Sequence, residues 1–238
     1  VVPNTVTKTL HTDKVYEPDL NSFTIEPFPY YSPLKSQIET IKSFDRPVIL
    51  VDDLVHTANR LQVLVPQLRE DGIPIKKVVV GVLSGYGRDL MQCLKVPVES
   101  IYSMPNLRQW FVESTLYPFI GGDTVRREEM KVAGLQPSIN MILPYATPRL
   151  SGCSREALVE FSACCIENSR DLFQVLEAEY RKMYAKNLTL SRLSEAVILP
   201  LCPDKGSCME YDENLAASVY LENDLETLWR MKEFLIKG

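Results

Sequence analysis

The chain has 238 residues, of which 45% are hydrophobic and 24% are charged, so it can build a sizeable core without disulfides. Its net charge of −5 opposes a broad interface with phosphate backbones, and nucleic acid is therefore not expected as a partner. No stretch approaches the roughly 18 consecutive apolar residues that span a bilayer, so no membrane partner is expected either.

The N-terminal sequence lacks the basic and apolar regions of a signal peptide, and it also lacks an initiating Met. We therefore expect a cytoplasmic protein that is either a part of a longer chain or a processed product. The six cysteines are interpreted as reduced thiols rather than as a disulfide framework. Cys202 and Cys208 have no histidine nearby, so no zinc site is expected.

Residues 1–33 are polar and rich in proline, which predicts an extended segment. Apolar residues at helical spacing predict a helix over 33–44, and the run "PVILV" that follows predicts a buried strand. Further along the chain, the pattern predicts a helix over 58–71, a strand over 75–85, a helix over 87–94 and a strand over 96–102. This alternation predicts an α/β fold with a mainly parallel open sheet.

The later part of the chain is interpreted differently. Helices are predicted over 107–119 and 124–134, and a further strand is predicted over 138–145. From residue 154 onward, sustained helical periodicity predicts a mostly helical C-terminal subdomain. The expected domains are therefore 1–153, an α/β domain, and 154–238, a helical subdomain.

Two adjacent aspartates, Asp52 and Asp53, come directly after the first predicted strand of the sheet. In open parallel sheets, ligands bind at the carboxyl ends of the strands. Two carboxylates there can accept hydrogen bonds from sugar hydroxyls or organise a hydrated Mg²⁺. The following loop leads into a helix whose N-terminus suits a phosphate. The alternative is a polar end to the strand, or a cap on the helix.

The stretch "VILVDDLVHTANRL" resembles the phosphoribosyl pyrophosphate signature of type I phosphoribosyltransferases. The resemblance implies that Asp52 and Asp53 hold the ribose, and that the 5′-phosphate is bound by His56, Thr57, Ala58, Asn59 and Arg60. It also implies an activity: with Mg²⁺, such an enzyme transfers ribose 5-phosphate to a nitrogenous base. The family commonly has Gly where this chain has Ala58, and Thr where it has Arg60.

The family also places a pyrophosphate-binding loop, often with a glycine, upstream of this signature, whereas residues 1–71 contain no glycine. A catalytically inactive domain is therefore the alternative to an enzyme. Such a domain would sense nucleotides or serve as a scaffold. The expected partners are a small sugar phosphate or nucleotide, and other domains of a longer chain or a second copy.

Three further features carry weaker hypotheses. Gly85 and Gly87 follow the second strand of the sheet and are interpreted as a turn. Trp110 and Phe111 could stack on a base, but an aromatic pair in an amphipathic stretch is more typical of a core.

The third feature is the Gly121-Gly122 pair, after which Asp123 or Thr124 is expected to cap a helix. The alternative is a second ligand loop, in which Arg126 and Arg127 would bind an anion.

Overall fold

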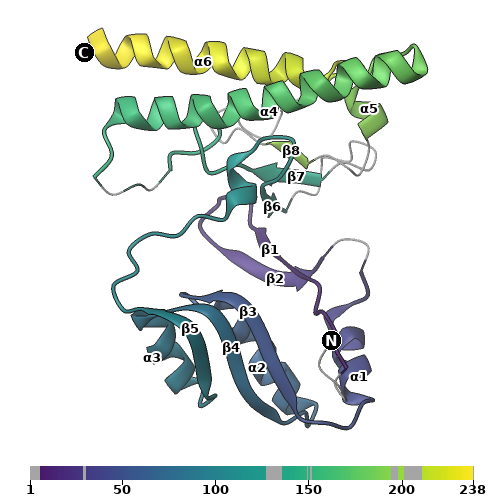
Figure 1. The fold of residues 1–238 in the computed structure, drawn as a ribbon, viewed down its shortest axis with the longest axis vertical. Helices are drawn as coiled ribbons and strands as arrows, with labels where there is room; N and C mark the ends of the chain where they lie inside the picture. The colour runs from purple at the N-terminus through teal and green to yellow at the C-terminus, as the bar shows by residue number, and fades with distance from the viewer. Residues whose placement is uncertain are drawn as a thin grey trace. The chain divides into compact units, whose positions relative to one another are not determined.

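The computed structural model describes residues 6–28, 31–126, 136–148, 150, 152–193, 198–200 and 211–237. The chain forms two compact units (Figure 1). Unit 1 consists of Val1–Lys14 and Thr24–Trp110, and unit 2 consists of Val15–Phe23 and Phe111–Gly238. The expected boundary between residues 153 and 154 does not coincide with the division between these units.

Unit 1 contains the predicted alternation of helices and strands. Its elements are α1 (Leu34–Lys42), β3 (Val48–Val55), α2 (Asn59–Glu70), β4 (Ile75–Ser84), α3 (Gly85–Cys93) and β5 (Val98–Met104). The strands form a three-stranded sheet in the order β3-β4-β5, and both strand pairs are parallel. The prediction of an α/β fold with a parallel sheet is confirmed.

The helices α2 and α3 cover the same face of this sheet. Crossover connections between parallel strands are right-handed, so two successive crossovers in one direction place their helices on one side. Accordingly, Val65 of α2 and Met91 of α3 share a hydrophobic cluster with Val78 and Val80 of β4. Figure 1 shows both helices lying behind the three strands.

The opposite face of the sheet carries apolar side chains that stay exposed. Val51 is 78% exposed, Ile101 is 75% exposed and Ile49 is 49% exposed. Parallel sheets are usually covered on both faces. The strand predicted to be buried, β3, is therefore covered on one face only. The described helices of unit 1 all lie on that covered face, and the face with Ile49, Val51 and Ile101 has no helix on it.

The described residues of the N-terminal segment are extended, as expected, and they include two strands, β1 (Thr12–Tyr16) and β2 (Phe23–Pro27). These strands do not join the parallel sheet of unit 1. They belong to a five-stranded sheet in the order β2-β1-β6-β7-β8, in which β1 pairs with β6 in parallel.

The remaining elements lie in unit 2. They are η1 (Glu113–Leu116), β6 (Asp123–Val125), β7 (Gln136–Ile139), α4 (Arg155–Tyr184), α5 (Leu190–Leu193), β8 (Ile198–Pro200) and α6 (Ala217–Lys237). The long helices α4 and α6 agree with the predicted helical character of the C-terminal part. That part also contains β8, which pairs with β7, so it is not purely helical.

The helix predicted over 107–119 is wrong, and the helix predicted over 124–134 is wrong at its start. Within 107–119 the structure has the short 3-10 helix η1, and at 124–125 it has strand β6; residues 127–134 lie outside the described residues. The predicted strand over 138–145 is also displaced, because β7 ends at Ile139. Long-range contacts explain the differences: Asn140 Nδ2 donates to the carbonyls of Thr115 and Gly121, and these contacts outweigh local propensity.

Helices α4 and α6 pack against each other in antiparallel orientation. Gln174 Nε2 donates to Glu222 Oε1 over 3.1 Å, and Lys232 Nζ donates to Glu160 Oε1 over 2.9 Å. The earlier residue of α4 thus contacts the later residue of α6, as antiparallel helices require. Ser154 begins α4 as an N-cap, with its hydroxyl accepting the Ala157 N–H.

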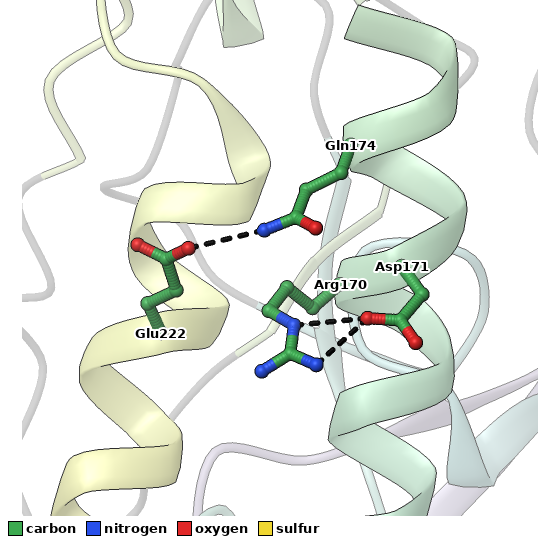
Figure 2. A network of polar contacts seen from close by, with 4 residues as sticks. All are labelled: Arg170, Asp171, Gln174 and Glu222. Carbon is green, nitrogen blue, oxygen red and sulfur yellow. Dashed lines mark hydrogen bonds and ion pairs between the residues drawn. The ribbon is translucent and has the colours of Figure 1, made fainter.

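Figure 2 shows the polar edge of this helix pair. The Arg170 guanidinium points to Asp171 of its own helix, with Nη2 to Oδ1 at 2.7 Å, while Gln174 reaches across to Glu222. Asp171 is also the main cause that raises the pKa of Arg170. The contacts of this edge are thus satisfied within and between the two helices, as in an ordinary helix interface.

Candidate functional site

The seven residues predicted from the sequence to bind a sugar phosphate all lie in unit 1, on β3, on the connection to α2 and at the start of α2. Residues 56–58 form the connection, which begins where β3 ends. In a parallel sheet this is the carboxyl-terminal edge, where the neighbouring strand β4 also ends. The loop therefore lies at this edge of the sheet.

Ala58, the residue before α2, has a left-handed backbone, with φ 51° and ψ 21°. This conformation costs roughly 1–2 kcal/mol for an L-residue with a Cβ, and Gly adopts it freely. It occurs at the position where the phosphoribosyltransferase signature has Gly. The side chain of Ala58 is buried in the cluster beneath α2, which offsets part of the cost.

The N-terminus of α2 has no side-chain cap and no acidic residue in its first turn. The Thr57 hydroxyl accepts a hydrogen bond from Asn59 Nδ2 over 2.9 Å, and Gln62 Nε2 donates to the Thr57 carbonyl over 2.9 Å. These bonds fix the loop while Thr57 itself stays exposed. Helix N-termini present N–H groups and a partial positive charge, which favour anions.

Asp52 does not end its strand, because β3 continues to Val55. Its side chain is 24% exposed, and its Oδ1 atom lies 3.7 Å from Nη1 of Arg60 on α2. The Asp53 N–H donates to Asp52 Oδ1 over 3.1 Å. Burial raises the pKa of Asp52, while the charge of Arg60 and the Asp53 N–H act in the opposite direction.

Asp53 lies on the other face of the strand. Successive side chains of a strand alternate between faces, and along β3 the odd-numbered residues from 49 to 53 are exposed while the even-numbered ones are half-buried. Its Oδ1 atom accepts the Leu54 N–H over 2.7 Å. The sequence prediction placed both carboxylates at one ribose; the structure places them on opposite faces of β3.

His56 contacts a residue that the sequence analysis did not single out. Its Nδ1 atom lies 2.8 Å from the hydroxyl of Ser84, the last residue of β4. Ser84 is buried and caps α3 by accepting the Gly87 N–H over 2.9 Å. The signal for this cap was present in the sequence as a Ser directly before Gly85. His56 also meets the exposed ring of Tyr86 edge-on, with ring centroids 6.1 Å apart.

The glycines of this region serve close backbone packing. A Cβ on Gly87 would overlap the carbonyl oxygen of Val55, and a Cβ on Gly85 would lie 2.6 Å from the carbonyl oxygen of Pro105. The expected turn at 85–87 is the first turn of α3. These glycines hold the end of β3, the end of β5 and the start of α3 together.

The second candidate loop belongs to unit 2 and is built for packing. Cβ atoms on Gly121 and Gly122 would collide with Ser114 and Ser138. Asp123 begins strand β6, so its predicted role as a helix cap is wrong, as is the same role for Thr124.

Arg126 pairs with Glu17, with Nε to Oε1 at 3.2 Å, and Arg127 lies outside the described residues. Trp110 and Phe111 are 47% and 45% exposed, so their predicted place in a core is wrong.

Within the part of the chain that the structure describes, no group of three or more His, Cys, Asp or Glu side chains is arranged as metal ligands would be. Among the described helices, none combines the length and the apolar character that crossing a membrane requires. The chain matches no known protein family, no curated protein and no solved structure.

Proposed function

We propose that unit 1 is a phosphoribosyltransferase-like domain that binds phosphoribosyl pyrophosphate or a nucleotide through its ribose and 5′-phosphate. The observation that carries this proposal is the left-handed backbone of Ala58. The loop thus has the conformation for which the family signature supplies a glycine, although this chain has none there. The loop also stands at the sheet edge where ligands of open α/β folds bind.

The phosphate would lie at the N-terminus of α2, against the Thr57 hydroxyl and the backbone N–H groups of the first turn. Arg60, in the same turn and with a half-exposed side chain, would add charge-assisted hydrogen bonds. Asp53, which is exposed, would accept hydrogen bonds from a ribose hydroxyl. Asp52 faces the helices and is a poorer candidate for the same sugar.

Mg²⁺ accompanies phosphoribosyl pyrophosphate in this family. Such an ion usually keeps several waters and is held by one or two carboxylates together with the phosphates of the substrate. Asp53, an exposed residue, would be the carboxylate that holds such an ion. The ion would neutralise charge on the pyrophosphate, and the protein would position the reacting groups.

A catalytically inactive nucleotide-sensing or scaffold domain is the second candidate. One structural observation favours it. The strands that precede β3 in the described chain, β1 and β2, belong to the five-stranded sheet and not to the parallel sheet of unit 1. The parallel sheet therefore has no described strand that could carry an upstream pyrophosphate loop.

Calorimetry with phosphoribosyl pyrophosphate, ribose 5-phosphate and nucleoside monophosphates, with and without Mg²⁺, tests the proposal. Asp53→Asn should lower the affinity for the ribose-containing ligands by about tenfold, since it removes a charged hydrogen-bond acceptor. Asp71→Asn is the matched control: it makes the same change at the other end of α2, where Asp71 pairs with Lys42, and it should leave affinity unchanged.

If folded protein binds none of these ligands, the proposed binding site is refuted and the scaffold role remains. If binding is found, release of pyrophosphate in the presence of a panel of nitrogenous bases separates the enzyme from the sensor.

A further inference from the structure

Arg60 occupies an unusual place for a cation. It lies in the first turn of α2, where the helix dipole disfavours positive charge. No acidic side chain of that turn compensates for it. The nearby negative group is Asp52, whose Oδ1 atom is 3.7 Å from Arg60 Nη1.

The contact between Arg60 and Asp52 is loose. A separation of 3.7 Å exceeds the length of a hydrogen bond, so the carboxylate attracts the guanidinium without engaging its N–H donors. The Arg60 side chain is 50% exposed, whereas Asp52 is 24% exposed. The carboxylate is also held by the Asp53 N–H, so it keeps a partner when Arg60 moves.

We propose that Asp52 is the resident counter-ion of Arg60, and that a phosphate bound at the N-terminus of α2 takes Arg60 away from Asp52. The inference rests on the proposed function, because it needs an anion at that helix end. It changes the role of Asp52: the residue regulates the affinity of the phosphate site and does not hold the sugar.

The two roles of Asp52 predict different effects of Asp52→Asn on the affinity for inorganic phosphate. If Asp52 holds the ribose, Asp52→Asn should leave the affinity for inorganic phosphate unchanged, because this ligand has no pair of hydroxyls. A counter-ion competes with the ligand for Arg60, so its neutralisation strengthens binding of inorganic phosphate. Partly exposed ion pairs contribute little, and the expected gain is about two- to fivefold in affinity.

The experiment is calorimetric titration of the full chain with inorganic phosphate. The variants are Asp52→Asn, Arg60→Ala and the double variant Asp52→Asn/Arg60→Ala, each with its fold checked by circular dichroism. We expect tighter binding by Asp52→Asn, weaker binding by Arg60→Ala, and no gain from Asp52→Asn once Arg60 is absent. Asp53→Asn removes the same charge from the opposite face of β3 and should give a smaller gain than Asp52→Asn.

Unchanged or weaker phosphate binding by folded Asp52→Asn overturns the inference and leaves the proposed function in place, provided that the unaltered protein binds phosphate. An equal gain in the Arg60→Ala background also overturns it, because competition for Arg60 would then not be the cause. If the unaltered protein binds neither phosphate nor ribose 5-phosphate, the proposed function fails and the inference fails with it.

Discussion

Gly87 packs against the end of β3, and this contact predicts that Gly87→Ala destabilises the protein rather than stabilising it. In an open helix, Gly→Ala stabilises by up to about 1 kcal/mol. At Gly87, however, the added Cβ would overlap the Val55 carbonyl oxygen and lie 2.8 Å from its carbon. These are backbone atoms that cannot rotate away, so we expect Gly87→Ala to destabilise by about 1–3 kcal/mol.

Urea unfolding followed by circular dichroism measures this difference, and amide hydrogen exchange of peptides from unit 1 assigns it to that unit. Gly72→Ala is the matched control, since Gly72 has φ 75° and no atom within 4 Å of a built Cβ. Gly72→Ala should lower the free energy of unfolding by at most about 1.5 kcal/mol. The strain of a left-handed Ala is partly offset, because Ala reduces the conformational entropy of the unfolded chain. A Gly87→Ala variant more stable than the original protein would refute the reasoning.

Three further predictions concern stability. Ser154→Ala removes the cap that accepts the Ala157 N–H and should lower the free energy of unfolding by about 1 kcal/mol in thermal melts. Phe173→Ala opens a cavity at a buried ring that packs edge-on against Phe119, and urea unfolding should show a loss of about 3–5 kcal/mol. Burial raises the pKa of Asp52, so its contribution to stability is full below the ordinary value of 3.8 and is lost as pH rises through the folded-state pKa. Asp52→Asn should therefore gain stability relative to the original protein as pH rises over that range, measured by urea unfolding at several pH values.

The elements of unit 1 could be predicted because their signals are local. The spacing of Leu34, Ile38 and Ile41 fixes the buried face of α1, and the same residues pack in one cluster with α2. Even Pro66, which argued against a continuous α2, lies inside that helix at an exposed position.

The elements of unit 2 depend on partners that are distant in the sequence. Strand β6 has three residues and pairs with β1, through Val15 opposite Thr124 and Tyr16 opposite Val125. No local pattern indicates a strand of this length, and the spacing of the surrounding charged and apolar residues is typical of a helix. Periodicity over a short window therefore predicted the wrong element, because the pairing that decides it joins residues more than a hundred positions apart.

The loop predicted from the sequence lies between β3 and α2, but the expected roles of the two aspartates depended on where β3 ends. If the strand stopped at Val51, both carboxylates would lie in a loop and could face one ligand. Because it continues through Leu54 and Val55, strand alternation separates Asp52 from Asp53. The presence of Arg60 in the first turn of α2 then gives the inward carboxylate a partner. In this chain an arginine stands where the family signature commonly has a hydroxyl. Under the proposed function, Arg60 would contact the phosphate as well as Asp52, and Asp53 would be the carboxylate that holds the sugar.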